Sequence, residues 1–579
     1  MTRYLQISLT VGLLLSLHYS QLAAAADLSH DQIYDKSKIL NVSIELPAAD
    51  WKQLCEQTRD PRGVFSGRID DPFTYFQGNI NIDGVQLNSV GIRKKGFIGS
   101  LDDQFPSLKI KFDEFVDQQP IEGLDGLTLN NNKQDMALVS QTLAYELFNA
   151  AGVTAPRCTF AKVTVNGKYL GIYSNVESIS KPMLKRRFDN DTGNLYEGTL
   201  ADFYPHAIER IEVKTNKKKH DRSKLDRLAK MLAEEEKLDI EQLEELVNLD
   251  NFLRYWAIES LIGFWDGYTN NQNNYWVYQN GKDGKFYFMP WGADAAFMQS
   301  GFPAFGPPAA NSIYAESLLA NRLIQDPAIS DRYRATMRWV LENVWKESEL
   351  IERIDAIETL LDGEPHSRQS GATRSMKDVR NFIKRRRAKI EKELDAWPAQ
   401  VPQFARKPMY VVPVGTLVGK FQTTWTGKPA TNLSSKKNAE MRLTLDDQPT
   451  IFEAVGVSMH PAPRGFMGFG PPMPPGPPTI DIVIEGLHAG KKTARLSLSL
   501  PEDIAKTAVG KVVELDGFYI PDANAGGFGM PFGGKTISGS ITFSKLGMQA
   551  GDALEATFDL KVAEVRGGFM NRERVEPGK

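Results

Sequence analysis

The stretch WDGYTNNQNNYW, from Trp265 to Trp276, holds one carboxylate and five amide side chains, and it has no lysine or arginine. It follows the apolar run YWAIESLIGFW, which has helical spacing, and it leads into NYWVYQNGKDGKFYFMPW. Alternating aromatic residues on both arms of a Gly-Lys-Asp-Gly turn predict a hairpin there. Asn is common in turns that have no catalytic role. The stretch is therefore either a solvated turn or a functional loop, and the segments on each side decide between these interpretations.

A carboxylate and an amide on a loop, followed by a hairpin and a second carboxylate, are typical of a site for a divalent metal and a nucleotide. Mg²⁺ binds one or two carboxylates together with phosphate oxygens. In phosphoryl transfer a loop Asp orients the attacking hydroxyl, a later Asn binds metal, and an Asp after the next hairpin bridges metal to the phosphates. Asp266, Asn274 and Asp294 stand in this order. The hairpin can bring Asn274 and Asp294 to one end of a sheet.

The upstream strand PSLKIKFDEF offers groups that could bind phosphate. Its alternation puts the apolar residues on one face and Lys109 and Lys111 on the other. A lysine there can neutralise the α- and β-phosphates, and a helix carboxylate such as Glu146 could hold it in place. In the alternative interpretation both lysines lie on the wet face of an edge strand and Glu146 faces solvent.

The chain is too long for one hydrophobic core, since it has 579 residues. Strands, one helix and further strands between about residues 35 and 180 predict a small α+β lobe. Helical periodicity dominates from about 181 to 396, and short alternating runs from 397 to 579 predict an all-β, sandwich-like domain with loops rich in Gly, Pro, Met and Phe.

The first residues indicate export. Residues 1–26 combine Arg3, the apolar run LTVGLLLSL and the small-residue end QLAAAAD, which is the layout of a signal peptide. The run is shorter than the ~20 apolar residues that span a bilayer, so we expect an exported protein, periplasmic or extracellular, with no membrane span. Cys55 and Cys158 could pair in an oxidising compartment, and both the paired and the free state remain open.

Composition narrows the function. A net charge of −3 with 24% charged residues does not favour a nucleic-acid partner, and the basic runs have acidic counterparts and no interleaved aromatic residues. The chain has no nucleophile elbow, no metalloprotease helix with paired His, and no Walker-type phosphate loop. The sequence gives little support to a hydrolase.

Several motifs in order resemble those of the CotH-type secreted kinases, a spore-coat-like family of highly diverged protein kinases. They are KKGFIGS, PSLKIKF, LTLNNN, LAYELFNAAGVTAPRCTFAKVTVNGKYLGIYSNVESI, GNLYEG, WDGYTNNQNNYWVYQN, FYFMPWGADAAF and RLIQDPAISDRY. They run from about Ile39 to Ala396. The resemblance implies a two-lobed kinase-like domain over residues 27–396, ATP with Mg²⁺ or Mn²⁺ as cofactors, and transfer of the γ-phosphoryl group to Ser or Thr of a secreted or envelope protein.

The resemblance also implies residue roles around the opening stretch. Asp266 matches the catalytic base, and Asn274 and Asp294 match the metal ligands. Asn271 and Asn273 are alternatives for the metal-binding amide, because the loop after Asp266 is longer than is common in the family.

On the upstream side, Lys111 or Lys109 matches the phosphate-binding lysine. Glu146 matches an acidic position in the helix, and Glu177 matches one in the segment between the lobes. Glu177 could instead cap the helix that follows it.

One position departs from the family pattern. Where the family usually reads PWDxD, this chain reads PWGAD, with Gly292 in place of the first carboxylate. Loss of a metal-bound carboxylate leaves phosphate charge less neutralised and could cost several kcal/mol of transition-state stabilisation. The alternative hypothesis is therefore a catalytically inactive kinase-like scaffold whose β-rich tail binds an envelope or matrix partner.

Overall fold

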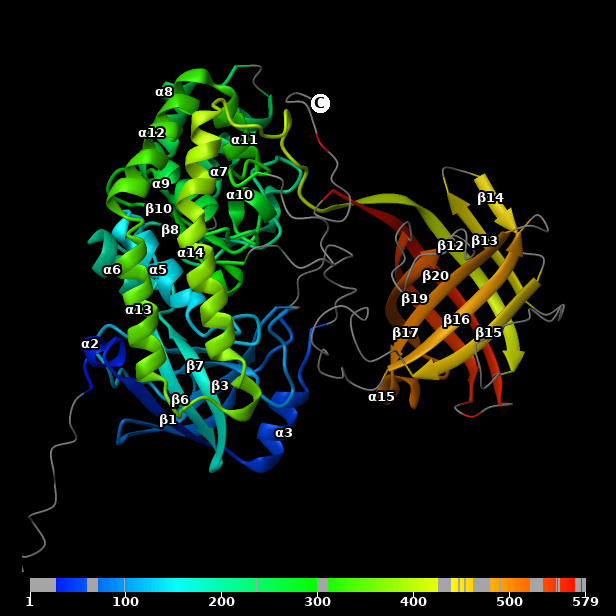
Figure 1. Ribbon diagram of the computed structural model, residues 1–579. Coiled ribbons are helices and arrows are strands. Elements are labelled where there is room, and N and C mark those ends of the chain that lie inside the picture. The colour runs from blue at the N-terminus through cyan, green and yellow to red at the C-terminus, as the bar shows by residue number, and fades with distance from the viewer. Residues whose placement is uncertain are drawn as a thin grey trace, which may run out of the picture.

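The computed structural model describes residues 28–59, 71–97, 99–219, 221–234, 237–298, 311–424, 439–445, 448–451, 454–461, 479–488, 492–520, 535–547, 549, 552–567 and 574. Figure 1 shows a body of strands and helices that ends with α14, and a second body built of long strands. We propose that the chain divides into domains near residue 397, between these two bodies. The expected signal peptide and most of the Gly-, Met- and Phe-rich loops lie outside the described residues.

The first part of the chain forms a closed seven-stranded sheet in the order β1-β2-β3-β4-β5-β7-β6. The strands β1 and β6 run parallel, and the other neighbours are antiparallel. The strands are β1 (Ile39–Glu45), β2 (Phe76–Ile82), β3 (Val85–Lys95), β4 (Ser107–Lys111), β5 (Gly126–Asn130), β6 (Cys158–Val165) and β7 (Lys168–Val176). The helices of this part are α2 (His30–Ile33), α3 (Ala48–Glu56) and α5 (Ser140–Ala150).

Local sequence explains these elements. The β2–β3 turn contains Asp83 and Gly84, and the β6–β7 turn contains Asn166 and Gly167; all four have positive φ, which these residue types adopt at low cost. In β4 the buried and partly exposed positions alternate as expected. The predicted α+β class of this part is therefore correct.

The next part is mainly helical and contains a second, four-stranded sheet in the order β11-β10-β8-β9. The strands are β8 (Asn194–Gly198), β9 (Ile211–Val213), β10 (Tyr275–Gln279) and β11 (Phe286–Pro290). The helices and 3₁₀ turns are α6 (Lys181–Phe188), η1 (Ile208–Arg210), α7 (Ser223–Glu234), α8 (Ile240–Leu246), α9 (Leu249–Leu261), α10 (Tyr268–Asn271), η2 (Ala293–Ala295), α11 (Leu318–Gln325), α12 (Pro327–Asn343), α13 (Glu347–Leu360), η4 (Ser367–Gln369) and α14 (Ala372–Asp395).

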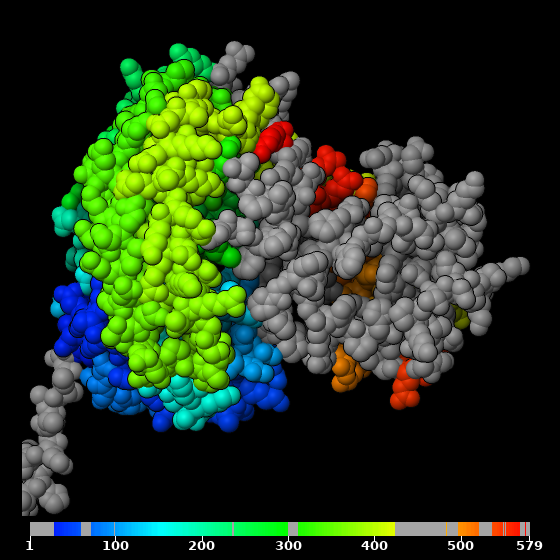
Figure 2. All heavy atoms as spheres, in the orientation of Figure 1, coloured from blue at the N-terminus to red at the C-terminus, as the bar shows by residue number. Residues whose placement is uncertain are grey.

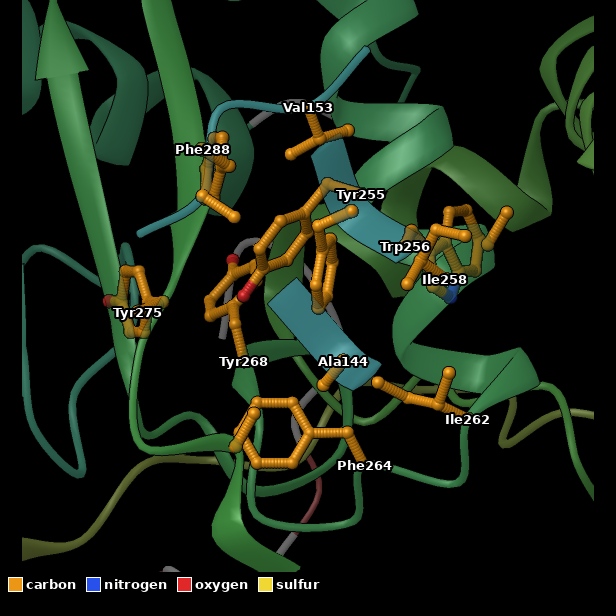
Figure 3. Close-up of a cluster of buried hydrophobic side chains, with 14 of the residues drawn as sticks. Ala144, Val153, Tyr255, Trp256, Ile258, Ile262, Phe264, Tyr268, Tyr275 and Phe288 are labelled. Carbon is orange, nitrogen blue, oxygen red and sulfur yellow. The ribbon is translucent and has the colours of Figure 1, made fainter. Parts of the chain in front are cut away.

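An aromatic core fixes the second sheet against α9. Figure 3 shows rings from α9 facing rings from β10 and β11, with Tyr268 between them. The ring centroids of Phe252 and Phe288 are 4.8 Å apart, and those of Tyr268 and Tyr275 are 4.5 Å apart. Each buried aromatic side chain removes a large apolar area from water, so this cluster holds the base of the α9–β10 loop firmly.

The turn between α13 and α14 reaches back to the closed sheet. Arg368 donates to the carbonyl oxygens of Leu170 at 3.2 Å and Asn131 at 2.9 Å, and Gln369 accepts from the backbone nitrogen of Ile172 at 3.0 Å. Figure 1 shows both helices running from the helical part to the edge of this sheet. The two parts are thus joined by more than the chain segment after β7.

The last part is all-β. Its described strands form one continuous nine-stranded sheet, in the order β14-β13-β12-β20-β19-β18-β17-β16-β15. The edge strand β15 contacts β12 and β13, which lie near the other edge, so the sheet curls round on itself. The elements are β12 (Tyr410–Thr424), β13 (Ala439–Leu445), β14 (Gln448–Ile451), β15 (Ala454–Pro461), β16 (Thr479–His488), β17 (Lys492–Pro501), α15 (Glu502–Ala505), β18 (Val512–Ile520), β19 (Lys535–Leu546) and β20 (Ala553–Arg566).

Two further expectations bear on the fold. Cys55 and Cys158 are both buried and both carry free thiols. They lie in separate hydrophobic clusters, one inside the closed sheet and one beside α5. Among the described residues, none of the helices has the length and apolar character needed to cross a bilayer.

Candidate active site

The loop that carries Asp266 connects α9 to α10 and is held by a buried carboxylate. Glu259, near the end of α9, accepts hydrogen bonds from the hydroxyl of Tyr255 at 2.6 Å and from the backbone nitrogen of Tyr268 at 2.9 Å. It also accepts from the backbone nitrogen and hydroxyl of Thr269, at 2.8 and 2.6 Å. Four donors on one side chain fix the path of the chain on both sides of Asp266.

The amide run of the opening stretch surrounds the Asp266 carboxylate. The side-chain nitrogens of Asn271 and Asn273 donate to Oδ1 at 2.6 and 3.2 Å, and that of Asn274 donates to Oδ2 at 2.8 Å. The carboxylate is partly exposed but has protein on most sides, and this burial raises the pKa of Asp266 to about 6, while the three amides favour the anion. The amides therefore position a carboxylate that a ligand can still reach.

A second carboxylate lies beyond the β10–β11 hairpin, at the same end of the sheet. The backbone nitrogen of Trp291 donates to the carbonyl oxygen of Asn274 at 3.0 Å, which joins the two ends of the hairpin. Asp294 follows in η2, and burial raises its pKa to about 7; repulsion from Asp266 and Asp135 acts in the same direction, and attraction to Lys95 opposes it. Asp266, Asn274 and Asp294 therefore meet, as the sequence order suggested.

The backbone at this end of the hairpin is left-handed at two facing positions. Asn274 has φ 53°, a conformation that Asn tolerates better than most residues. Gly292 has φ 53° and ψ 38°. A Cβ atom at Gly292 would lie 2.7 Å from Oδ1 of Asn274. The amide oxygen of Asn274 thus occupies the space that a side chain at position 292 would need.

The lysine that faces this cluster is Lys95, at the end of β3. Its Nζ donates to Oδ1 of Asn130 at 2.5 Å, and Asn130 donates to Oε1 of Gln141 in α5 at 2.9 Å. The ammonium also lies 5.8 Å from the ring centroid of Trp291. Burial lowers the pKa of Lys95 to about 8, attraction to Asp294 opposes this, and Lys109 adds to it. A chain of amides therefore connects the lysine to the helix.

The two lysines that we singled out from the sequence have other neighbours. Lys111 pairs with Glu114 at 2.8 Å and with Asp113 at 3.7 Å, which raises its pKa. Lys109 lies opposite Arg93 in the β3–β4 pairing. Burial lowers the pKa of Lys109, and repulsion from Arg93 adds to this. Lys111 is thus bound by the carboxylates that follow it in the chain. Lys109 lies on the same face of the β3–β4 pair as Lys95.

The expected pairing of Glu146 with one of these lysines is wrong. Its carboxylate binds Lys36 at 2.8 Å and Arg353 at 3.2 Å. An α-helix turns by about 100° per residue, so Glu146 points about 140° away from Gln141, whose side chain bonds to Asn130 of the sheet. The helix supplies a neutral amide where the sequence suggested a carboxylate.

Glu177 is a structural ion-pair residue. Arg186 donates to its two oxygens at 2.5 and 2.7 Å, and His30 lies 3.1 Å from Oε1. Burial acts to raise its pKa, but these partners prevail and its pKa is lowered. The carboxylate joins α2, β7 and α6, so its position is explained without a ligand.

Lys95 could have been found from the sequence by the same alternation argument that selected Lys109. In β3 the neighbouring Lys94 points to the opposite side, where its Nζ donates to the carbonyl oxygen of Cys55 at 2.6 Å. Lys95 pairs with Ser107 across the β3–β4 ladder, two positions from Lys109, so both lysines share one face. Nothing in the local sequence signals Gln141, because its role depends on how α5 packs.

The donors present suit a hard divalent cation bound together with phosphate. Two carboxylates, Asp266 and Asp294, and the amide oxygen of Asn274 are oxygen ligands, which Mg²⁺ and Mn²⁺ prefer. Among the described residues there is no cluster of three or more His, Cys, Asp or Glu side chains suited to metal. The site therefore fits a cation that completes its coordination with phosphate oxygens and water, as Mg²⁺ does.

A strand lysine, a loop aspartate followed by an asparagine, and an aspartate beyond a hairpin are the residue types found in kinase-class phosphotransferase sites. This chain belongs to the CotH kinase protein family, whose sequence model matches residues 92–397, more than half of the chain.

Individual relatives are distant. Inner spore coat protein H of Bacillus subtilis is 25% identical over 194 residues, which are 32% of this chain and 53% of that protein. Invasin CotH2 of Rhizopus delemar is 23% identical over 257 residues, which are 40% of this chain and 43% of that protein. The chain spans about half the length of the curated relatives it matches.

Two solved structures are weakly similar. The Helicobacter pylori proinflammatory kinase CtkA aligns with 50% of this chain and 93% of its own, at 11% identity and a TM-score of 0.25. A chain of the Shewanella oneidensis HipA, HipB and operator DNA complex aligns with 52% of this chain and 67% of its own, at 11% identity and a TM-score of 0.28. These scores are too low to support conclusions, and the family assignment rests on the sequence match.

Proposed function

We propose that this protein is an exported atypical protein kinase that transfers the γ-phosphoryl group of ATP to Ser or Thr side chains of extracytoplasmic proteins. The observation that carries the proposal is the meeting of Asp266, Asn274 and Asp294 at one end of the β10–β11 hairpin, with the Lys95 ammonium facing them. The leader-like residues 1–26 support export.

Asp266 is the proposed base. Its carboxylate orients the acceptor hydroxyl and takes up the hydroxyl proton as the oxygen attacks the γ-phosphorus and ADP leaves. The amides of Asn271 and Asn273 hold Oδ1, so Oδ2 is the oxygen with fewer protein donors. This leaves Oδ2 as the atom that receives the proton.

Asn274 and Asp294 are the proposed metal ligands. A bound Mg²⁺ or Mn²⁺ would neutralise charge on the transferring phosphoryl group. The like charges of Asp266 and Asp294 repel each other, which raises the affinity of the pair for a divalent cation.

Lys95 takes the phosphate-binding role that the sequence suggested for Lys109 or Lys111. It is held by Asn130, which is neutral, so its positive charge is not cancelled by a paired helix carboxylate. Its depressed pKa, about 8, still leaves it mostly protonated at neutral pH, and a bound phosphate favours that form.

Nucleotide binding and transfer are tested separately. Mg·ATP at 100 times its Kd should stabilise the protein by about 2.7 kcal/mol, so the melting temperature should rise. Purified protein should transfer labelled γ-phosphate to itself or to a generic acceptor, and Asp266→Ala should abolish labelling while its melting temperature still rises with Mg·ATP. Labelling that survives in this variant would exclude Asp266 as the base.

A catalytically inactive scaffold is the second candidate, and Gly292 favours it. The family pattern has a carboxylate there, and this chain has none. In that case the nine-stranded sheet would act by binding an envelope or matrix protein. Absence of any shift in melting temperature at millimolar Mg·ATP, with no labelling, would favour the scaffold over the kinase.

A further inference from the structure

The segment that joins α14 to β12, residues 398–409, lies outside the part of the chain that matches the family, yet it contacts the loop that carries Asp266. We define it as the linking segment. Arg406 lies within it and is only 4% exposed. A guanidinium buried this deeply retains its charge and requires hydrogen-bond acceptors, so its partners are informative.

The Arg406 side chain binds the amide run directly. Its Nη2 donates to the carbonyl oxygen of Asn270 at 2.9 Å and to Oδ1 of Asn271 at 3.3 Å. The nitrogen of the same Asn271 amide donates to Oδ1 of Asp266 at 2.6 Å. By occupying the amide oxygen, Arg406 fixes the orientation in which Asn271 offers its nitrogen to the carboxylate.

The backbone of Arg406 is held from both sides. Its nitrogen donates to the carbonyl oxygen of Glu316 at 2.8 Å, and its carbonyl oxygen accepts from Nε2 of Gln272 at 2.7 Å. Glu316 in turn donates through its backbone nitrogen to Thr269 at 2.8 Å. Hydrogen bonds therefore join the linking segment to α10, both directly and through Glu316; we call this group of bonded segments the layer.

Arg574, which follows β20 in the chain, also contacts this layer. It forms an isolated antiparallel bridge with Arg406, and its side chain donates to the carbonyl oxygen of Phe404 at 2.8 Å and pairs with Glu316 at 3.0 Å. Figure 2 shows red atoms, from late in the chain, against yellow-green atoms that follow α14. Residues before β12 and after β20 thus both lie beside the Asp266 loop.

The linking segment also contacts the other side of the site. Met409, 4% exposed, packs in a small cluster with Leu200, Phe97 and Val565. Phe97 lies two residues after Lys95, and the backbone nitrogen of Leu200 donates to Oδ1 of Asn273 at 3.2 Å. One segment therefore touches the neighbours of both the lysine and the aspartate.

We propose that Arg406 is a positioning residue for the phosphotransfer reaction: from outside the family domain, it orients Asn271 and through it the Asp266 carboxylate. The expected effect on kcat rests on the proposed function. The ordering of Asn271 by Arg406 does not depend on it. This role of Arg406 makes the linking segment part of the catalytic unit instead of a tether to a separate sheet.

The test compares full-length Arg406→Met and Arg406→Lys with Arg566→Met. Arg566 is a partly exposed arginine of β20 that pairs with Glu564, so it controls for loss of charge in the last part of the chain. Methionine keeps the apolar stem, and lysine keeps the charge but loses the planar fork. We expect kcat of both Arg406 variants to fall about 10²-fold, because small displacements of a reacting group are costly, while KM for Mg·ATP is unchanged. Arg566→Met should match the parent protein.

Amide hydrogen exchange of residues 270–274 without nucleotide gives a readout that is independent of activity. Exchange there should be faster in both Arg406 variants, with no change in α12 or α13. If the parent protein neither binds nor transfers phosphate but exchange rises in this way, the proposed function fails and the positioning role stands. If kcat and exchange at residues 270–274 match the parent protein, or if KM rises as much as kcat falls, Arg406 has no positioning role.

Discussion

Restoring the missing carboxylate with Gly292→Asp should weaken the site instead of improving it. Gly292 has φ 53°, where a residue with a Cβ pays about 1 kcal/mol or more. The new Cβ would lie 2.7 Å from Oδ1 of Asn274 and must displace that side chain, which loses its hydrogen bond to Asp266 at a cost of about 1 kcal/mol. We expect the free energy of unfolding to fall by about 2 kcal/mol in total.

The matched control is Gly363→Asp. Gly363 has φ 75°, and a Cβ there would meet nothing within 4 Å, so this variant carries the backbone cost without the contact. Urea unfolding of both variants, followed by tryptophan fluorescence, isolates the displacement of Asn274 as the difference between them. Labelling with γ-phosphate should fall in Gly292→Asp alone. Higher labelling in Gly292→Asp, or equal stability of the two variants, would refute this account of why glycine stands at position 292.

Three other predictions concern the lysine, the loop and pH. Lys95→Met should lower kcat/KM for Mg·ATP about 10²-fold, whereas Lys111→Met, which loses its ion pairs with Glu114 and Asp113, should change it by about twofold or less in the same labelling assay. Glu259→Gln should lower the free energy of unfolding by about 2–3 kcal/mol in urea titrations. The backbone N–H and the hydroxyl of Thr269 now donate to a carboxylate oxygen, and in the variant they would face an amide nitrogen that is itself a donor. Finally, kcat/KM should decline as pH rises through about 8, since the free enzyme's Lys95 ammonium loses its proton there; a flat profile up to pH 10 would assign phosphate binding to another group.

The sequence predicted the secondary-structure elements better than it predicted the contacts of the site residues. Alternation located β4, and the Gly-Lys-Asp-Gly turn located the β10–β11 hairpin, because these signals depend on residues a few positions apart. Alternation also placed Lys109 on the correct face, but it did not distinguish Lys109 from Lys95 on the neighbouring strand. That choice depends on which strand end lies near η2. This is set by contacts between residues far apart in the chain.

One error and one open choice have the same origin. Glu146 was selected by charge, whereas the helix rotation set by packing of α5 turns Gln141 to the sheet. Strand spacing predicted the all-β class of the last part, but this spacing is the same for one curled sheet and for two packed ones. Arg406 lies beyond the residues that carry the family resemblance, and only the folded chain brings it to Asn271.

The neutrality of the donors around Asp266 has an electrostatic consequence. Lysine or arginine side chains could grip the carboxylate equally well, but each would add a positive charge beside it and repel an incoming Mg²⁺. Amides on Asn271, Asn273 and Asn274 fix the direction of the oxygens without adding positive charge of their own, and the Arg406 guanidinium, which lowers the pKa of Asp266, binds the amide of Asn271. Rigidity and cation attraction, which usually compete at an acidic centre, are thereby obtained from one run of asparagines.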